Sequence, residues 1–570
     1  MCPTSDILND VASKSAQSEL YTPVPPCYKL GQCKYVVVLG TVISGLGKGI
    51  FSSSAAKLLK DKGFRVSPIK LEGYLNIDSG TLNPYRHGEV FVLDDGMETD
   101  MDLGTYERML DQNLSSLSFI TSGQIFTSVL EKERRGRYQG RDVQMIPHVT
   151  GEVKLRLREL AMATSADIVF VEIGGTVGDV ENSFLIEAVR ELALEEGPNS
   201  TCFVSLTYIL EPQALGEQKS KAAQLGLRSL MALGIQPHII ACRGKSPATD
   251  TVKQKISIYA NVPMERVFSM HDTQSIYYVP AMIRENKIDT EILKLLNLQD
   301  RVNHDLERNQ WENWCNFTQK IVSPQKEIDI AITGKYITVR DSYASILKAI
   351  EHCGAHLHTK FNLNWIDTTE VTNQNVAEKL KGMHGVIVPG GFGIRGTEGK
   401  IACIQYAREN KLPYLGLCYG FQMAVIEFAR NVCKLHGAGS TEIDPKCEHP
   451  VIDRLPSQYD LKGLGGNMRL GGHDIELVPG TLAAKLYNGT TARLRFRHRY
   501  EVHPKYIQQL TENGMIFSGK APGEPIMQIL ELADHPFFMG TQAHPEFTSR
   551  PLNPDPLFCH FAQAAILHRG

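Results

Sequence analysis

The sequence has no large excess of charge of either sign and no long apolar run. Its 570 residues carry a formal net charge of −3, so the overall charge attracts neither nucleic acid nor an anionic membrane, and we predict neither as a partner. No apolar stretch approaches the roughly 20 residues that cross a bilayer. The first residues, MCPTSDILND, lack the basic and apolar regions of a secretory signal. We therefore expect a cytoplasmic protein.

The sequence also lacks paired cysteines. Its 12 cysteines are scattered from Cys2 to Cys559 with no CxxC pair, which argues against a zinc cage and against a small disulfide-linked domain. We expect reduced thiols, most of them buried as small apolar side chains. A chain of this length exceeds one domain of about 100–250 residues, so we expect two large domains or three small ones.

Strand-like apolar runs alternate with helix-like segments over the first half of the chain. These runs are KYVVVLG (34–40), ADIVFVEI (166–173), residues 202–210 and HIIAC (238–242). The alternation is typical of βαβ units and a parallel sheet. We predict an α/β domain over 34–299.

A second alternation follows a polar, strand-poor stretch at 300–326, which we interpret as an interdomain linker. It includes IDIAITGKY (328–336), GVIVPGG (385–391) and LPYLGLC (412–418). We predict a second domain over 327–570, so that the fold class is α/β with two doubly wound parallel-sheet domains. Residues 1–33 are polar and contain PVPP, and we expect a disordered or loosely docked extension there.

The motif GLCYG (416–420) places Cys418 between two glycines, after an apolar strand and before the helix-like stretch FQMAVIEFAR. A nucleophile on a sharp strand-to-helix turn needs such small neighbours. The positive end of the helix also favours the thiolate, which is the reactive form of cysteine. Cys418 is therefore a candidate nucleophile, and the alternative is a buried structural cysteine.

Two further motifs supply what a cysteine nucleophile needs. AHPEF carries His544 and Glu546 two residues apart, so on extended backbone both side chains point to one side. Cys418, His544 and Glu546 would then form a triad of nucleophile, base and orienting carboxylate. The glycine turn PGGFG (389–393) offers backbone N–H groups for an oxyanion hole. Each motif alone is more often an ordinary turn, but together they predict a catalytic site.

The region from about 328 to 569 resembles the class I glutamine amidotransferases in PGGFG, GLCYG, a later STE and HPE. The resemblance implies that Cys418 attacks the side-chain amide of glutamine and releases ammonia. It also implies that Glu442 and Arg499 hold the amino-acid end of the substrate, as a carboxylate and a guanidinium can do. The full implied glutamine site comprises Gly391, Tyr419, Gly420, Phe421, Gln422, Glu442 and Arg499.

A glycine-rich loop, VVVLGTVISGLGKGI (36–50), lies between a predicted strand and a helix in the first half. Backbone N–H groups of such a loop hold phosphates, and Lys48 can reach their terminal oxygens. The loop is not a standard Walker A motif, because Gly49 follows the lysine and Gly40 lies too far upstream. The alternative is a plain Rossmann-type turn.

Acidic and basic residues near this loop predict a nucleotide with a metal ion. Carboxylates in DDGMETDMDLG (94–104) and Glu172 in VEIGGTVGDVE suit Mg²⁺, which bridges nucleotide phosphates. For the first stretch, the alternative is a solvated acidic face. Lys219 and Lys221 stand at the start of a predicted helix, and Lys255 comes later in the chain. A phosphate at that helix start would be attracted both by the lysine charges and by the helix dipole. Exposed helix lysines are otherwise usually solvated surface.

Residues 34–569 as a whole resemble the CTP synthase family. The matching motifs are VISGLGKGI, KLEGYLNIDSGTLNPYRHGEVFVLDDGMETDMDLGTYER, EKERRG, QMIPHVTGE, VEIGGTVGDVE and GEQKSKAAQ. The resemblance implies a first domain like P-loop NTPases and dethiobiotin synthetase, and a second domain like class I glutamine amidotransferases. It implies that ATP contacts Gly45, Leu46, Gly47, Lys48, Gly49, Ile50, Lys70, Asp102, His271, Asp272 and Thr273.

The same resemblance implies the remaining ligands. It places Mg²⁺ on Asp102 and Glu172, and an internal ammonia path beside His87. UTP, and CTP as an inhibitor, would contact Ser44, Asp179, Val180, Glu181, Lys219, Ser220, Lys221, Ala222, Ala223, Gln224 and Lys255. The implied reaction converts UTP, ATP and L-glutamine to CTP, ADP, phosphate and glutamate, which is the last step of de novo CTP synthesis. The resemblance also implies activation by GTP and nucleotide-promoted homotetramers, with filaments as a further form of assembly.

The sequence departs from the family pattern in three places. Ala222 and Ala223 stand where KTKPTQ is common, Glu72 and Gly73 where KLDPY is common, and Phe496 where a histidine is common. Two rival functions stay open at this point. One is another amidoligase such as a cobyrinic acid a,c-diamide synthase, which the lysine set disfavours. The other is an inactive, filament-forming homologue, which retention of the triad and of Lys48 disfavours.

Overall fold

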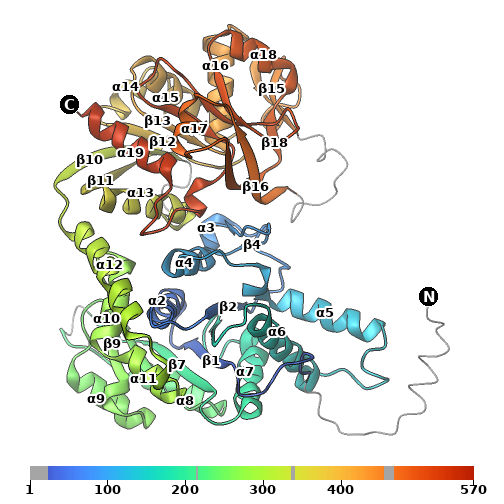
Figure 1. Ribbon diagram of the computed structural model, residues 1–570, viewed down its shortest axis with the longest axis vertical. Coiled ribbons are helices and arrows are strands. Elements are labelled where there is room, and N and C mark those ends of the chain that lie inside the picture. The colour runs from blue at the N-terminus through green and yellow to red at the C-terminus, as the bar shows by residue number, and fades with distance from the viewer. Residues whose placement is uncertain (1–22, 213–215, 335–339, 455–467, 570) are drawn as a thin grey trace. The chain divides into compact units, whose positions relative to one another are not determined.

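The computed structural model describes residues 23–212, 216–334, 340–454 and 468–569, which form two compact units (Figure 1). The first unit contains the chain up to residue 77 together with 105–312, and the second contains 78–104 and the chain from 313 onward. Within the stretch predicted as a linker, residues form a helix, α12 (His304–Val322), which spans the boundary between the units. The segment 78–104 lies inside the stretch predicted as the first domain, 34–299, and it groups with the second unit.

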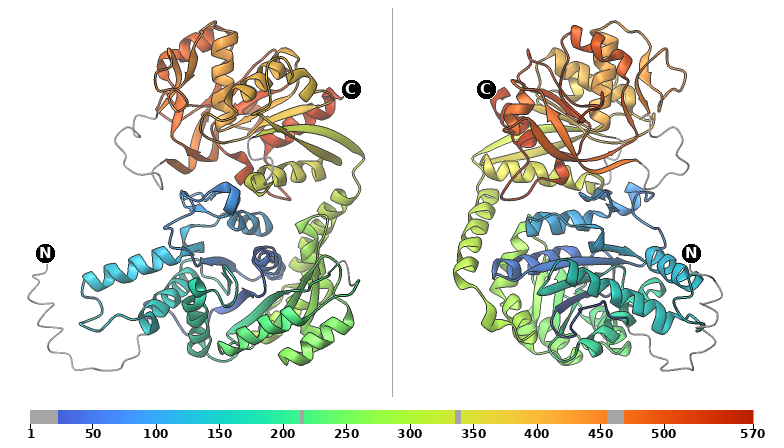
Figure 2. Two further views of the ribbon diagram at one scale, coloured as in Figure 1. Left: turned by 180° about the vertical axis from the view of Figure 1, so that it is seen from behind. Right: turned by 45° about the vertical axis from the view of Figure 1, so that its right-hand side comes forward.

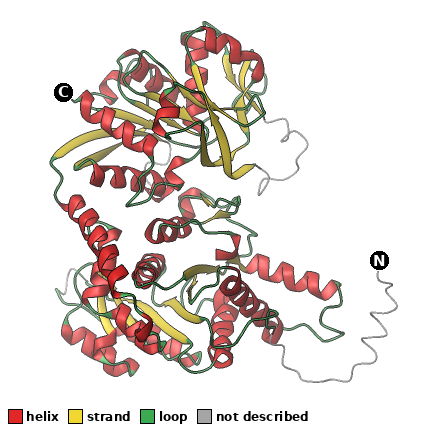
Figure 3. Ribbon diagram, viewed as in Figure 1, coloured by secondary structure: helices red, strands yellow, loops and turns green. Residues whose placement is uncertain are grey.

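The first unit is built on a seven-stranded sheet in which every pairing is parallel. Alternate side chains of its central strand face opposite sides, and Tyr35, Val37 and Leu39 join one buried cluster with residues of the helices that cover that face. Helices lie on both faces of the sheet (Figure 3). This confirms the predicted α/β fold. The sheet order is β5 (Phe119–Thr121), β2 (Val66–Glu72), β6 (Ile168–Ile173), β1 (Lys34–Gly40), β7 (Thr201–Tyr208), β8 (Ile239–Gly244) and β9 (Val267–His271).

The helices of the first unit follow the strands in the order expected of βαβ units. They are α2 (Lys48–Asp61), α4 (Met101–Leu110), α5 (Ser122–Arg134), α6 (Thr150–Ala163), α7 (Ser183–Glu196), α8 (Lys221–Ala232), α9 (Asp250–Ala260), α10 (Val279–Glu285) and α11 (Ile288–Leu295). Helix α4 starts in the second unit and ends in the first.

Part of the expected N-terminal extension makes specific contacts with the first unit, while residues 1–22 lie outside the described residues. The Tyr28 hydroxyl donates to Glu196 at 3.1 Å and lies 2.7 Å from the Tyr35 hydroxyl. The Gly31 N–H donates to the same Glu196 carboxylate at 2.8 Å. The buried Arg158 guanidinium donates to Glu196 and to the Pro23 carbonyl. Residues 23–33 are therefore anchored by a buried polar network.

The second unit contains a nine-stranded sheet that is parallel only over its first five strands. The remaining strands pair antiparallel, so this sheet is mixed. Helix α13 (Ala344–His356) packs beside β11 (Thr359–Asp367) at one edge of the sheet (yellow in Figure 2). The order is β11 (Thr359–Asp367), β10 (Lys326–Gly334), β12 (Gly385–Val388), β13 (Tyr414–Leu417), β21 (Phe538–Thr541), β20 (Met527–Glu531), β19 (Ile516–Lys520), β16 (Arg469–Leu477) and β17 (Thr491–His498).

Two buried clusters hold helices to opposite faces of this sheet. On one face, Val386, Val388 and Tyr414 pack with α15 (Thr397–Glu409) and α16 (Tyr419–Asn431). On the other face, Ile387 and Leu415 pack with α13 and α19 (Pro556–His568). The helices are α3 (Pro84–His87), α13 (Ala344–His356), α14 (Val376–Lys379), α15 (Thr397–Glu409), α16 (Tyr419–Asn431), α17 (Leu482–Leu486), α18 (Pro504–Glu512) and α19 (Pro556–His568). Smaller sheets join β14 (Ala438–Ser440), β15 (His449–Arg454) and β18 (Tyr500–Val502), and β3 (Phe91–Val92) with β4 (Glu98–Thr99).

Arginines along β17 hold segment 78–104 against the rest of the second unit. Arg493 pairs with Asp94 at 2.8 Å, and Arg497 pairs with Glu98 at 2.7 Å. Between them, Arg495 donates to the Val92 carbonyl at 3.1 Å. The close approach also requires glycine on β16, because a Cβ on Gly472 would lie 2.0 Å from the Asp94 carboxylate. The Glu98 side chain is fully buried, so this part of the acidic loop is not a solvated face.

No helix among the described residues is long and apolar enough to cross a membrane. The described cysteines are all free thiols, and among them only Cys27 is exposed.

Candidate active site

Cys418 occupies the turn between β13 and α16 in a strained backbone conformation, with φ 48° and ψ −96°. The two neighbouring glycines make this turn fit, since a Cβ on Gly420 would lie 2.1 Å from the Val388 carbonyl and one on Gly416 2.3 Å from the Tyr414 hydroxyl. The Cys418 N–H donates to the Thr541 carbonyl at 2.7 Å, which ties the turn to β21. A buried thiol on a strained strand-to-helix turn is the geometry expected of a nucleophile.

His544 and Glu546 form a buried pair, with His544 Nδ1 2.7 Å from Glu546 Oε1. We expected extended backbone between these two residues, and this prediction is wrong. Pro545 starts a short 3-10 helix (Pro545–Phe547), and this turn brings the two side chains together. Burial alone lowers the pKa of His544, but the negative charges of Glu546 and of the Cys418 thiolate outweigh burial and raise this pKa to about 10. Both negative charges therefore favour the imidazolium form of His544.

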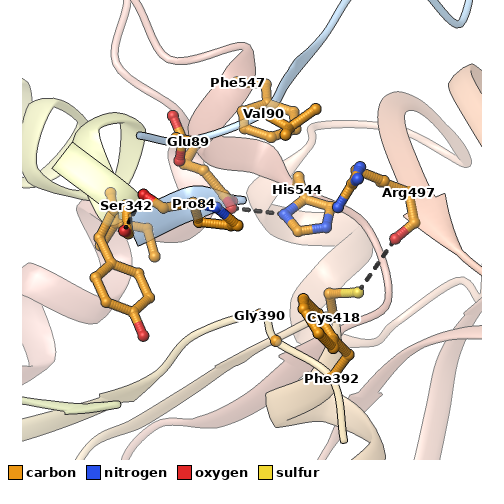
Figure 4. Close-up of a pocket in the computed structure, with 14 residues that line it drawn as sticks. Pro84, Glu89, Val90, Ser342, Gly390, Phe392, Cys418, Arg497, His544 and Phe547 are labelled. Atoms are coloured by element: carbon orange, nitrogen blue, oxygen red, sulfur yellow. Dashed lines mark hydrogen bonds and ion pairs between the residues drawn. The ribbon is translucent and has the colours of Figure 1, made fainter. Parts of the chain in front are cut away.

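The three side chains line a cavity of about 110 Å³ (Figure 4). The glycine turn PGGFG lies against it, because a Cβ on Gly390 would come within 3.2 Å of His544 Cε1 and 3.7 Å of Cys418 Cβ. The far wall comes from segment 78–104, through Pro84, Glu89 and Val90. His87 follows Pro84 on the short helix α3, but it does not line the cavity.

A larger pocket of about 680 Å³ adjoins Cys418, and it contains four of the residues predicted to bind glutamine. These are Gly391, Gln422, Glu442 and Arg499. The Glu442 carboxylate also accepts from the Gly393 N–H at 2.8 Å and so holds the PGGFG turn. The other three predicted residues, Tyr419, Gly420 and Phe421, are buried in the first turn of α16 outside the pocket lining.

Sequence reasoning missed the contribution of 78–104 to this site. Residues 80–85 and Val90 line the larger pocket beside the glutaminase motifs. A signal was present in the sequence, because Arg493, Arg495 and Arg497 alternate along one strand and the acidic stretch 94–104 offers partners of opposite charge.

The glycine-rich loop of the first unit joins β1 to α2 with a left-handed turn at Gly45 (φ 71°) and another at Gly47 (φ 80°). The buried Lys48 donates to the Gly175 carbonyl at 2.7 Å, in the glycine turn after β6. Gly47 faces the end of β9, where a Cβ would lie 3.3 Å from Met270. The predicted phosphate loop, the turn after Glu172 and the predicted adenine-side residues after Met270 therefore share one edge of the sheet.

Lys70 and Glu172 meet at this same edge. Lys70 Nζ lies 3.0 Å from Glu72 and 3.9 Å from Glu172, and the Tyr106 hydroxyl donates to Glu172 at 3.0 Å. Glu172 is buried, as expected of a strand-end carboxylate rather than a surface acid. Asp102, in the first turn of α4, belongs to the second unit and Glu172 to the first, so a shared metal stays a prediction.

Six of the residues predicted to bind UTP and CTP lie at the start of α8, and Lys255 lies within α9. Lys219 pairs with Glu217 just before α8, and Ser220 is the residue that precedes this helix. The positive charges of Lys219 and Lys255 both lower the pKa of Glu217. Lys221, Ala222, Ala223 and Gln224 form the first turn of α8, where the Gln224 amide donates to the Ser220 hydroxyl.

The other predicted nucleotide contacts lie at or after the ends of three strands, β6, β1 and β9. Asp179 accepts from the Thr176 N–H at 2.7 Å, and Val180 and Glu181 are exposed at the start of a short 3-10 helix. Ser44 is exposed beside the phosphate loop. At the end of β9, the His271 ring contacts Ser269, Asp272 pairs with Arg243, and Thr273 donates to the Ser275 carbonyl. Gly73 allows close approach of Glu181, because a Cβ there would lie 3.2 Å from Glu181 Cβ.

Among the described residues, no three His, Cys, Asp or Glu side chains are grouped to hold a metal ion. A magnesium ion does not need such a group, because it keeps several waters and is held by one or two carboxylates and substrate phosphates. The buried Glu172 carboxylate beside the glycine-rich loop has the oxygen chemistry that this binding mode uses.

Comparison with known proteins finds matches for both halves of the chain. A family model described as CTP synthase N-terminus matches residues 34–298, and one described as glutamine amidotransferase class-I matches residues 338–564. A solved structure, the glutaminase domain of Trypanosoma brucei CTPS with bound acivicin, is 34% identical, covers 42% of this chain and 94% of that chain, and has a TM-score of 0.40.

Two relatives are similar over nearly their whole length. The CTP synthase of Thermococcus gammatolerans is 48% identical over 533 residues, which are 93% of this chain and 98% of the relative. The CTP synthase of Caldanaerobacter subterraneus subsp. tengcongensis is 46% identical over 533 residues, which are 94% of this chain and 98% of the relative. With both of its units accounted for in this way, the chain belongs to the CTP synthase family of glutamine-using ligases.

Proposed function

We propose that the chain makes CTP by two coupled half-reactions, glutamine hydrolysis in the second unit and ATP-dependent amination of UTP in the first. The observation that carries the proposal is the strained, buried Cys418 beside the His544–Glu546 pair. The ATP-dependent half-reaction is supported by one edge of the first sheet, where the glycine-rich loop lies with Lys48 and Glu172. The rival scaffold function would not require a strained cysteine, which costs folding energy.

In the glutaminase half, the Cys418 thiolate attacks the side-chain carbonyl carbon of glutamine. The developing oxyanion would meet backbone N–H groups of the PGGFG turn, which lies against Cys418 and His544. His544 gives its proton to the departing ammonia, and Glu546 keeps the imidazole oriented. Water then hydrolyses the thioester with His544 as the base, which releases glutamate and restores the thiolate.

Ammonia must leave this site as NH₃, because ammonium has no free electron pair for attack. The small cavity beside Cys418, walled by Pro84, Glu89 and Val90, supports an exit through segment 78–104. This segment also carries His87, which we propose to lie along the path. An enclosed route would protect NH₃ from protonation by solvent.

In the synthase half, the γ-phosphoryl group of ATP is transferred to O4 of the UTP ring, which makes phosphate the leaving group. Ammonia attacks C4, and phosphate departs to give CTP. Lys48 and Lys70 would balance the charge on the transferred group. Asp102 and Glu172 would hold Mg²⁺, which supplies charge neutralisation on the phosphates when bound. Homotetramers, GTP activation and CTP inhibition are further parts of the proposal.

The experiment that tests the function is CTP formation by the purified full chain. We expect CTP and glutamate only when UTP, ATP, Mg²⁺ and glutamine are all present, and CTP without glutamate when an ammonium salt replaces glutamine. The rival corrin amidoligase would leave UTP unchanged and consume ATP only with a corrin substrate. An inactive scaffold would yield no product with either nitrogen source.

The raised pKa of His544 predicts how glutamine use depends on pH. The thiolate–imidazolium pair exists only while His544 keeps its proton, so glutamine hydrolysis should persist until the pH nears 10 and decline above it. Glu546→Gln removes a negative charge that raises this pKa, so the decline should move down by about one unit or more. The measurement is kcat/KM for glutamine against pH. An unchanged upper limit in Glu546→Gln would contradict the assignment.

Feedback by CTP should be competitive with UTP and should depend on Glu181. Both nucleotides can use the lysines at 219, 221 and 255, but only CTP offers an amino group to an acidic acceptor. A uracil carbonyl facing that acceptor would be left unpaired, which discriminates strongly. Glu181→Ala should raise the inhibition constant for CTP about tenfold and change the KM for UTP little. Glu133→Ala, in the last turn of α5, is the matched control.

Initial rates against UTP at several CTP concentrations decide this prediction. A noncompetitive pattern, or unchanged inhibition in Glu181→Ala, would refute it.

A further inference from the structure

A buried glutamine side chain, Gln542, lies beside the sulfur of Cys418. It follows β21 directly and precedes His544 by two residues. Its amide nitrogen Nε2 is 3.4 Å from Cys418 Sγ, and the residue has no exposed surface. Neither the triad nor the predicted glutamine site gives this residue a role.

A chain of hydrogen bonds fixes which end of the Gln542 amide faces the sulfur. Gln422 Nε2 donates to the Tyr500 carbonyl at 2.9 Å, and a carbonyl can only accept. The same Gln422 nitrogen gives its second hydrogen to Gln542 Oε1 at 3.1 Å. With its oxygen used in this way, Gln542 presents its NH₂ group to Cys418. The Tyr500 carbonyl therefore determines, through Gln422, that Gln542 donates to the sulfur.

The sulfur has two kinds of neighbour, and they suit different protonation states. The Arg497 carbonyl, 3.6 Å from Sγ, accepts from the thiol (Figure 4). A thiolate has no proton for that carbonyl, but it can accept from the Gln542 N–H and from protonated His544. A donor that is already in place at a buried sulfur costs no rearrangement when charge develops there.

We propose that Gln542 is a catalytic residue of the glutaminase site, which donates a hydrogen bond to the Cys418 thiolate and so increases its population and fixes its direction of attack. The proposal rests on the assignment of Cys418 as the nucleophile. Gln422 connects it to the substrate pocket, because Gln422 lines the 680 Å³ pocket and its Oε1 has no hydrogen-bond partner among the described residues. A bound ligand can donate to this oxygen without breaking the chain of amides.

The test compares Gln542→Met with wild type in the full chain. Methionine has nearly the same volume but cannot donate, so the rate of Cys418 alkylation by iodoacetamide at neutral pH should fall about tenfold and its pH midpoint should rise by about one unit. Gln542→Glu, which keeps the shape and places an acidic group beside the sulfur, should shift the midpoint in the same direction. Alkylation is followed by mass spectrometry of the Cys418 peptide.

Gln528→Met is the matched control. Gln528 is also fully buried, and neither end of its side-chain amide has a partner among the described residues, so methionine there should leave Cys418 reactivity unchanged. Ammonia-dependent CTP formation shows that each variant is folded. An unchanged alkylation profile in either Gln542 variant overturns the proposal. Full glutamine-dependent activity in Cys418→Ala would instead overturn the nucleophile assignment, whatever Gln542 does.

Discussion

Cys418→Ala is expected to abolish CTP formation from glutamine and to preserve CTP formation from ammonium salts. The thiolate supplies the only bond to the substrate carbon in the proposed glutaminase mechanism, and removing the nucleophile of a catalytic triad costs four or more orders of magnitude in rate in known cases. Ammonia bypasses this step, because it enters the reaction after glutamine hydrolysis. Raised pH increases the fraction of NH₃ and makes the comparison more sensitive.

Cys403→Ala is the matched control for this experiment. Cys403 is fully buried in α15, one of the two helices packed on the same face of the sheet, and burial raises the pKa of its thiol to about 12. Alanine there removes a sulfur from the same core without touching the site, so both nitrogen sources should still support activity. Glutamine use that survives in Cys418→Ala would contradict the assignment, as would a folded variant that loses ammonia-dependent activity.

The strands that precede the two catalytic motifs could be predicted because each is a continuous apolar run in the sequence. The run KYVVVLG forms β1 with the predicted limits. The run LPYLGLC contains β13, which ends directly before the turn at Cys418. Both motifs combine a buried strand with a glycine turn, so local sequence alone determines where the chain must bend. The antiparallel half of the second sheet was not predicted, since strands such as β16, with two glycines and several polar residues, show no continuous apolar run.

The grouping of 78–104 with the second unit could not be read from local pattern. Its strands β3 and β4 have two residues each, too short for any periodicity. Its position depends on partners about 400 residues away, through the Arg493–Asp94 and Arg497–Glu98 pairs. Charge complementarity suggests such pairs, but it does not choose among the many acidic residues of a chain of this length.

The same limit explains the Gln542 contact and the His544–Glu546 turn. Spacing of two residues is compatible with an extended strand or with a 3-10 turn, and Pro545 decides in favour of the turn. Gln542 approaches Cys418 only because β13 and β21 are paired, with Leu417 beside Thr541. Strand order is a long-range property, so a residue that acts through it carries no local signal.

Lys48→Met should slow CTP formation about a hundredfold to a thousandfold with glutamine and with ammonia alike. The side chain is buried between the glycine-rich loop and the turn after β6, where its Nζ donates to the Gly175 carbonyl. In a site with little water, one preorganised donor to developing charge contributes about 3–4 kcal/mol to the transition state. Phosphoryl transfer to UTP precedes amination in the proposed order, so the nitrogen source should not matter.

Methionine keeps the length and apolar stem of Lys48, so the fold should tolerate it, and the rates are measured at saturating ATP and UTP. Lys60→Met is the control, because Lys60 lies in the last turn of the same helix and donates to Gln112 instead of facing the glycine-rich loop. It should leave both rates within a few-fold of wild type.

Glutaminase activity measured as glutamate release separates the two halves of the enzyme, because Cys418 is intact in Lys48→Met. Near-normal turnover with ammonia in Lys48→Met would show that the lysine does not serve phosphoryl transfer, since ammonia bypasses only the glutaminase half.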